Sequence, residues 1–284
     1  QPGDGHDEDA QREPASPPAS ALSVDLLVNG IQTYDALLAA FARATHHIHL
    51  EYYIFEPDKT GARIRDALIE QARRGIRVRL LLDRLGSKNA DEAFLRPLRE
   101  AGAEIEFFHP YFFKRLWRPE INLRSHRKIV VIDGCTGFTG GINITDDENE
   151  AIRDDAYVDL HFRISGEIVR WLQLAFVADW LYAGGRFAAD DRYFPVPSET
   201  AGPVTAQVLA AGPDTPFEPI HRAQVFAINA ARKRVLLVTP YFVPSESAMM
   251  ALTSAALRGV DTALVVPLRS DSLMVSLAAR SYFD

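Results

Sequence analysis

Residues 122–143 read NLRSHRKIVVIDGCTGFTGGIN, and the run KIVVID at residues 128–133 within them decides the fold class. A run that is apolar almost throughout is typical of a strand that is buried on both faces. Such a strand belongs to a sheet that is covered by helices on both sides. The stretch therefore predicts an α/β protein with a layered sheet.

Helical and strand patterns alternate in the residues before this strand. The spacing of apolar residues predicts helices over 33–44, 62–73 and 92–100, and strands over 47–55, 76–82 and 105–108. The most apolar helical stretch is residues 169–182, which still carries Arg170 and Asp179. This alternation supports the same α/β class.

Two parts of the chain repeat one order of elements. FARATHHIHLEYYIF at 41–55 precedes a helix and RRGIRVRLLLDRLGS, and INAARKRVLLVTPYFV at 228–243 precedes a helix and LRGVDTALVVPLRSDS. Ile48 then corresponds to Val235, and Gly75 corresponds to Gly259. We therefore expect duplicated α/β sandwich units, the second of them incomplete.

Composition divides the chain into four segments. Residues 1–21 are acidic and rich in Pro and Ser, which predicts a disordered lead-in. We expect the first domain over 22–185, a connection rich in Pro, Gly and Ala over 186–219, and the start of the second domain over 220–284.

The overall composition excludes several classes of protein. The chain has 31 Lys and Arg against 38 Asp and Glu, so the formal charge is −7 and no nucleic acid is expected as a partner. Cys135 is the one cysteine, which rules out an intrachain disulfide and a cysteine metal cluster. The sequence has no run of about 18 uncharged apolar residues, so we expect no membrane span in it.

Phosphate chemistry is the natural use of the polar residues around the apolar run. His126 and Lys128 are two residues apart, so in a strand their side chains share a face. An imidazole can attack phosphorus or transfer a proton, and a lysine is a point charge for phosphate oxygens. Gly140 and Gly141 would let backbone N–H groups approach an anion, and Asn143 could donate an amide hydrogen to it.

These residues resemble a known motif. The pattern His126-x-Lys128-x4-Asp133-x6-Gly140-Gly141-x-Asn143 is similar to the HKD motif of the phospholipase D superfamily. The flanking segments HLEYYIF, YVDLHFRISG and TPYFVPSES look like those of the bacterial cardiolipin synthases in that superfamily. The resemblance covers the chain from about residue 26 to its last residue.

The resemblance implies a phosphatidyl transfer that joins two phosphatidylglycerols into cardiolipin and releases glycerol, through a phosphohistidine and without a metal or another cofactor. It implies that His126 is a catalytic histidine. It also implies that Lys128 and Asn143 hold the phosphate of the substrate. Asp133 is grouped with the catalytic residues as the motif acid, which organises the strand and its loop. Asp159 takes the place of a carboxylate that orients the histidine.

Further polar residues carry weaker expectations. Glu51 and Thr239 occupy equivalent places in the two repeats, so both are candidates for lining the site. His47 and His49 share a strand face, but no clustered carboxylate supports a metal site there. His109, His161 and His221 are interpreted as satisfied structural residues.

The family has two HKD motifs, whereas this sequence shows one. The repeat offset predicts the second histidine at roughly residues 310 to 313, beyond Asp284. We therefore expect a truncated chain that is inactive, or nearly so, by itself. The family's N-terminal membrane helices are also missing, so the expected location is the bacterial cytoplasmic membrane, either peripherally or through those helices.

Cationic and aromatic residues alternate in YFFKRLWRPEINLRSHRK at 111–128. This composition suits the surface of an anionic bilayer, and we expect the segment to dock there and bring phospholipid to His126. The competing interpretation is a core aromatic cluster with solvated arginine tips.

Two other functions use the same residues. A phospholipase D or a nuclease-type hydrolase would pass the phosphoryl group to water, and the motif does not separate that reaction from transfer. A non-catalytic scaffold is the third hypothesis, which the intact motif disfavours. The second phosphatidyl substrate, the nucleophilic histidine and the oligomeric state stay open.

Overall fold

The protein is represented by a computed structural model that describes residues 16–108, 125–196, 202–212, 215, 218–267 and 273–282. The chain divides into two compact units, residues 1–214 and 215–284, each of which is described here by itself. The elements of the first unit are, in chain order, β1 (Ala19–Ala21), β2 (Ser23–Val28), α1 (Asn29–Ala42), β3 (His47–Tyr52), α2 (Lys59–Arg73), β4 (Arg77–Asp83), α3 (Glu92–Glu100), β5 (Glu104–Phe108), β6 (Ile129–Ile132), β7 (Thr136–Gly140), β8 (Leu160–Ser165), α4 (Val169–Tyr182) and β9 (Val204–Ala206).

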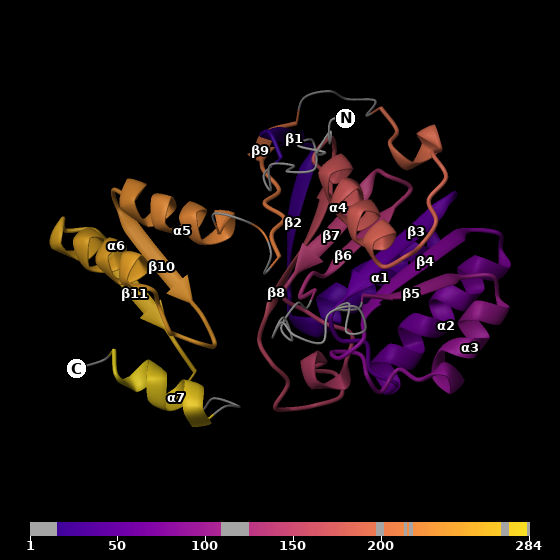
Figure 1. Ribbon diagram of the computed structural model, residues 1–284, viewed down its shortest axis with the longest axis horizontal. Coiled ribbons are helices and arrows are strands. Elements are labelled where there is room, and N and C mark those ends of the chain that lie inside the picture. Colours follow the sequence, from indigo (N-terminus) through magenta and orange to yellow (C-terminus); the bar gives the residue numbers. More distant parts are fainter. Residues whose placement is uncertain are drawn as a thin grey trace, which may run out of the picture. The chain divides into compact units, whose positions relative to one another are not determined.

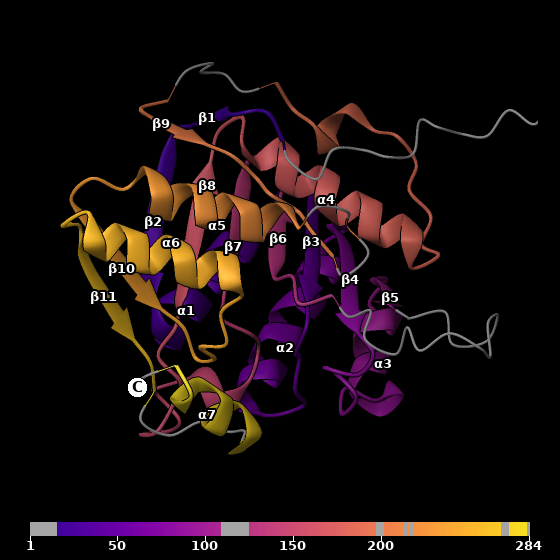
Figure 2. The same cartoon turned by 60° about the vertical axis from the view of Figure 1, so that its left-hand side comes forward.

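A seven-stranded mixed sheet forms the centre of the first unit, in the order β2-β8-β7-β6-β3-β4-β5. Strands β3, β4 and β5 are parallel, and every other neighbouring pair is antiparallel. Helices α1, α2 and α3 cover one face, and α4 covers the other (Figures 1 and 2). This layered architecture confirms the predicted α/β class.

Strand β6 shows why the apolar run decides the fold. Val130 and Ile132 belong to the core beneath α1 and α2, whereas Ile129 and Val131 belong to the core beneath α4. Each of the four residues is at most 5% exposed. A strand buried on both faces needs apolar residues at every position, which is what the sequence has.

The second unit repeats part of this order. Its elements are α5 (Pro219–Ala230), β10 (Arg234–Val238), α6 (Glu246–Leu257), β11 (Asp261–Val265) and α7 (Leu273–Arg280). Strands β10 and β11 are parallel, as β3 and β4 are. The sequence helix–strand–helix–strand is therefore common to α1–β4 and α5–β11, which agrees with a duplicated unit. Within the described ranges, no helix has the length and apolarity that crossing a membrane requires.

Two expectations differ from the structure. The disordered lead-in was expected to reach residue 21, but Ala19–Ala21 form β1 and pair with Val204–Ala206 of β9. Ala21 is fully buried there, which disorder would not allow. The strand expected over 47–55 ends at Tyr52, because the next backbone N–H groups donate to side chains instead of a neighbouring strand. Ile54 N donates to Asn143 Oδ1 (3.3 Å), and Phe55 N donates to Ser87 Oγ (3.0 Å).

Two buried histidines on β3 face α4. His47 Nε2 lies 3.2 Å and His49 Nδ1 lies 3.1 Å from the side-chain oxygen of Gln173. Burial, followed by the neighbouring charge of His46, lowers the pKa of His47 to about 4. Burial also lowers the pKa of His49 well below its ordinary value. The fold therefore holds both rings in their neutral form.

The pKa of His47 makes the stability of the first unit depend on pH. A histidine whose pKa is lower in the folded chain stabilises the fold above its unfolded pKa, near 6.5, and this contribution is lost as pH falls towards 4. We expect the His47 share of this loss to be about 3 kcal/mol. Urea unfolding followed by tryptophan fluorescence at several pH values measures it, because Trp171 and Trp180 lie in α4.

The variant His47→Gln should flatten this pH dependence even if it lowers stability at pH 7.5. His221→Gln is the matched control, because His221 is bonded to two serines of the second unit and should leave the slope unchanged. An unaltered slope in His47→Gln would contradict the assignment.

Candidate active site

Lys128 and His126 come together around the ring of Tyr53. The Lys128 Nζ atom donates to the backbone oxygen of His126 at 3.0 Å and lies 5.6 Å from the centre of the Tyr53 ring. The imidazole of His126 stacks on the same ring, with centroids 3.8 Å apart and planes at 20°. Lys128 is buried and His126 is exposed, so the site holds a buried cation and an exposed imidazole at one tyrosine ring.

The two neighbours of His126 are anchored to the body of the first unit. Ser125 donates through its hydroxyl to Glu51 and through its N–H to Asp83 Oδ2 (3.2 Å). Arg127 forms an ion pair with Asp179 of α4. Glu51, a predicted site-lining residue, thus lies beneath the segment. Burial, followed by the charge of Asp179, raises its pKa well above the usual range.

Asn143 has its amide orientation set by a buried carboxylate. Glu148 Oε1 accepts from the Asn143 side-chain amide and Oε2 accepts from its backbone N–H, both at 2.7 Å. The side-chain oxygen of Asn143 accepts from Ile54 N. This network leaves one amide hydrogen of Asn143 for another acceptor. Burial raises the pKa of Glu148, although its bonds to Asn143 and the charge of Lys128 oppose that shift.

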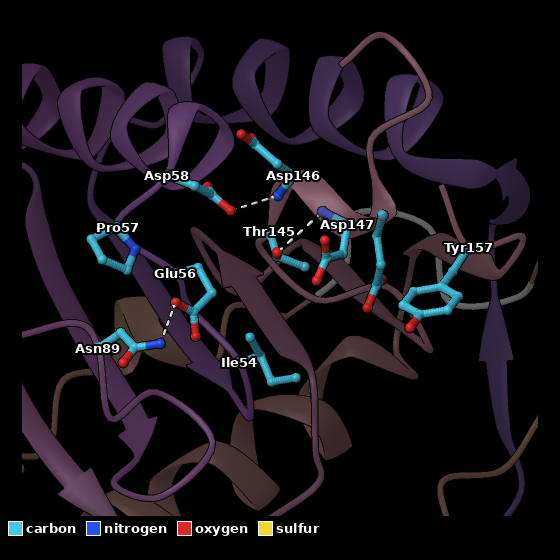
Figure 3. Close-up of a pocket in the computed structure, with 10 residues that line it drawn as sticks. Ile54, Glu56, Pro57, Asp58, Asn89, Thr145, Asp146, Asp147 and Tyr157 are labelled. Atoms are coloured by element: carbon cyan, nitrogen blue, oxygen red, sulfur yellow. Dashed lines mark hydrogen bonds between the residues drawn. The ribbon is translucent and has the colours of Figure 1, made fainter. Parts of the chain in front are cut away.

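The turn that carries Glu148 is fastened to the start of α2. Asp146 accepts from the N–H (2.8 Å) and hydroxyl (2.7 Å) of Thr60, and its own N–H donates to Asp58 (2.6 Å). Figure 3 shows the contact between Asp146 and Asp58 on the wall of a pocket that Glu148 and Tyr157 also line. The position of Glu148, and through it of Asn143, is therefore set by helix α2.

Gly140 and Gly141 make room for the chain at the start of β8 and for Asp159, the residue before it. A Cβ atom on Gly140 would lie 2.6 Å from His161 Cα, and one on Gly141 would lie 2.2 Å from an oxygen of Asp159. The N–H of Gly141 donates to Leu160 O at 2.9 Å. The expectation that both glycines offer N–H groups to an anion therefore needs correction, because this one is used within the sheet.

The predicted histidine-orienting residue Asp159 lies against Gly141. Its charge raises the pKa of Lys128, as the charge of Glu148 does, but burial has the larger effect and the net shift is downward. The charges of the two carboxylates favour the ammonium form of Lys128, the form that binds a phosphate oxygen.

Asp133 lies at the far end of β6 from Lys128. It accepts from Thr45 N and Oγ1 and from the backbone N–H groups of His46 and His47, at 2.8 to 2.9 Å. Burial alone would raise its pKa, but these bonds lower it. Asp133 and Gly134 take φ values of 52° and 66°, as a type I′ turn requires. The structure thus joins Asp133 to the start of β3 and not to His126, although the sequence groups it with the catalytic residues.

Thr239 belongs to the second unit, where its N–H donates to Val265 O (3.2 Å) and its hydroxyl contacts Tyr241 O (3.3 Å).

The interpretation of His161 as a satisfied residue is wrong, because neither ring nitrogen has a hydrogen-bond partner among the described residues. His109 and most of the cationic and aromatic segment, residues 111–124, lie outside the described residues.

Sequence reasoning missed three residues of the site. Tyr53 lies within the segment HLEYYIF, but the strand predicted over 47–55 placed it inside the strand, whereas the structure ends β3 one residue before it. Glu148 follows the motif asparagine by five residues, but nothing in that spacing shows that the chain turns back. His161 is two residues beyond Asp159, hence on the same face of a strand.

Comparisons with known proteins agree with this geometry. A family model described as cardiolipin synthase, PLD-like domain, matches residues 37–180. The chain is 37% identical over 282 residues to cardiolipin synthase 1 of Bacillus cereus. The matched region covers 96% of this chain and 55% of that protein. It is 42% identical over 263 residues to the cardiolipin synthase of Alkalihalophilus pseudofirmus, covering 91% and 52% respectively. The chain spans about half the length of the curated relatives that it matches.

A solved structure shares the fold. The phosphatidylserine synthase of Haemophilus influenzae superposes with a TM-score of 0.64 at 13% identity, over 93% of this chain and 69% of that one. At that identity the likeness supports the fold alone.

The bonds of Asp133 predict a structural role. Asp133→Ala should lower the free energy of unfolding by about 2 to 4 kcal/mol, because three backbone donors and one hydroxyl lose their acceptor. Asp66→Ala, which removes an exposed carboxylate paired with Arg65, should cost less than about 0.5 kcal/mol. Urea titrations compare the two, and equal effects would contradict the structural role.

The bonds of Glu148 predict a specific effect on Asn143. Glu148→Gln places an NH2 group opposite one of two donors and should cost about 1 to 3 kcal/mol. It should also move the side-chain amide resonances of Asn143 in a ¹⁵N NMR spectrum. Glu167→Gln, at an exposed position, is the control that should leave both readouts unchanged. Unmoved Asn143 resonances in Glu148→Gln would argue against this network.

Proposed function

The chain belongs to the cardiolipin synthase, phospholipase D-like domain family, and on that premise we propose that it carries one half of an active site for phosphatidyl transfer. One observation supports the proposal most: the exposed imidazole of His126 and the buried ammonium of Lys128 both lie at the ring of Tyr53, and the ammonium donates to the backbone oxygen of His126. The curated relatives named cardiolipin synthases are about twice as long, so the activity proposed is that of such a longer protein.

The proposed reaction joins two phosphatidylglycerols. The imidazole of His126 attacks phosphorus, a P–N bond forms, and the P–O bond to the leaving glycerol breaks. The leaving oxygen takes a proton from a second acid, which the family resemblance assigns to another histidine. The hydroxyl of a second phosphatidylglycerol then attacks phosphorus and loses its proton to that same group, and the P–N bond breaks. The two histidines exchange roles if the other one is the nucleophile.

Lys128 and Asn143 would hold the non-bridging phosphate oxygens during both steps. The ammonium supplies charge, and the one side-chain amide hydrogen of Asn143 that Glu148 leaves available supplies direction. In this proposal Asp159 acts on the histidine as a carboxylate that supports the imidazolium, as the resemblance implies. Gly140 and Gly141 contribute by allowing the backbone of β8 and the side chain of Asp159 to approach closely.

Phospholipid is the substrate class that the family implies, and phosphatidylglycerol is our specific proposal. We place the reaction at the anionic surface of the bacterial cytoplasmic membrane. This proposal rests on the composition of residues 111–128, of which the structure describes only the last four.

The proposal predicts that the chain binds a soluble phosphodiester through Lys128. Glycerophosphoglycerol, the deacylated head group, should shift the ring resonances of His126 in a saturable NMR titration. Lys128→Met should weaken the affinity about tenfold or more, because a charged hydrogen-bond donor is lost. Lys88→Met is the control at an exposed position and should bind as the parent chain does.

Equal binding by the parent chain and Lys128→Met would overturn the proposal. Incubation with phosphatidylglycerol vesicles adds a second test, in which the chain alone should form little or no cardiolipin. Robust turnover by the chain alone would show that His126 has a proton-transfer partner among these 284 residues.

A further inference from the structure

His161 is a buried histidine that the proposed reaction does not use. It lies in β8, where it pairs with Leu27 of β2 and Gly140 of β7, and it is 0% exposed. Among the described residues, neither its Nδ1 nor its Nε2 atom has a hydrogen-bond partner. Buried polar atoms without partners are rare in proteins, and they concentrate where a functional partner is found.

The sheet register brings His161 towards Lys128. Ile129 pairs with Thr139, so Lys128 stands opposite Gly140, and Gly140 stands opposite His161. Cross-strand neighbours project from the same face of a sheet. Gly140 has no side chain, and a Cβ atom there would lie 2.8 Å from His161 Nδ1. The imidazole therefore occupies the space above Gly140, on the face of the sheet to which Lys128 also belongs.

The charge state of this ring suits an acceptor. Burial, followed by the charge of Lys128, lowers the pKa of His161 to about 3, so the ring is neutral at physiological pH. A neutral imidazole carries one nitrogen without a proton, and that nitrogen accepts hydrogen bonds. It can therefore lie beside an ammonium without the repulsion that a second cation would cause.

The hydrogens of Lys128 leave a place for such an acceptor. An ammonium has three donors. One hydrogen points to the backbone oxygen of His126, and one would point to the bound phosphate. Both oxygens of Glu148 already accept from Asn143, so Glu148 acts on Lys128 through its charge, as Asp159 does.

We propose that His161 is a positioning residue for Lys128, whose third ammonium hydrogen it accepts through its unprotonated ring nitrogen when phosphate is bound. The ammonium is then fixed at three points: the His126 carbonyl, the phosphate and the imidazole. This inference rests on the proposed role of Lys128 as the phosphate ligand.

Tyr52 is the rival for this role. Ile129 pairs with Glu51, so Tyr52 stands opposite Lys128 on the other side of β6. Its hydroxyl is also buried and has no partner among the described residues. The charge of Glu148 reaches Tyr52, whose pKa is raised mainly by burial. Tyr52→Phe therefore serves as the matched variant, because it removes a buried unpartnered polar atom near the same lysine.

The test compares His161→Phe with His161→Gln in the full 284-residue chain. Phe keeps a ring without an acceptor, whereas Gln restores an acceptor at similar reach. We measure the affinity for inorganic phosphate by titration, and the pKa of Lys128 by NMR of its side chain in the presence of saturating phosphate. His161→Phe should lower the pKa of Lys128 by about one unit and weaken phosphate binding about tenfold. His161→Gln should restore most of both, and Tyr52→Phe should change neither.

Three outcomes would overturn the inference. His161→Phe could match the parent chain, both His161 variants could be impaired equally, or Tyr52→Phe could reproduce the loss. If His161→Phe does not fold, as judged by circular dichroism, His161→Met replaces it as the variant without an acceptor. Unchanged phosphate affinity in Lys128→Met would instead contradict the proposed function, whereas a loss of affinity in Lys128→Met with none in His161→Phe would contradict the role of His161 alone.

Discussion

Burial of the Lys128 ammonium is the constraint around which the site is arranged. Removing a cation from water is expensive unless charge and hydrogen-bond acceptors surround it. The structure supplies the carbonyl of His126, the ring of Tyr53 and the charges of Glu148 and Asp159. Each of these groups is held by its own contacts, so the lysine is fixed before a phosphate arrives. A cation that is already desolvated and oriented interacts with an anion more strongly than one on a mobile surface side chain.

Strand β3 links this site to the rest of the first unit, because its alternating side chains serve two different layers. His47, His49 and Glu51 point to the α4 layer, whereas Ile48, Leu50 and Tyr52 point to the α1 and α2 layer. The alternation ends where the strand ends. The next residues, Tyr53 and Ile54, leave the ladder and contact His126 and Asn143. The end of one buried strand thereby places two groups of the site.

Features that depend on the pattern of neighbouring residues could be predicted from the sequence. Features that depend on contacts between strands distant in the sequence could not. The apolar run of β6 and the capped helix over 92–100 carry their signals within a few residues, and both were found. The motif was recognised by its spacing, but the roles of Asp133 and Gly141 follow from what lies across the sheet. Asp133 meets the start of β3, and Gly141 meets Asp159. Likewise, β1 depends on a partner strand more than 180 residues away, which composition does not reveal.

The placement of His126 follows from its neighbours more than from its own side chain. Ser125 is tied to β3 and β4 through Glu51 and Asp83, and Arg127 is tied to α4 through Asp179. The backbone between them has little freedom, so the exposed imidazole rests on Tyr53 without being buried itself. This arrangement reconciles two requirements of a group that reacts with phosphorus. The ring must be accessible to a substrate, and it must be held in place, and anchoring the flanking residues provides both.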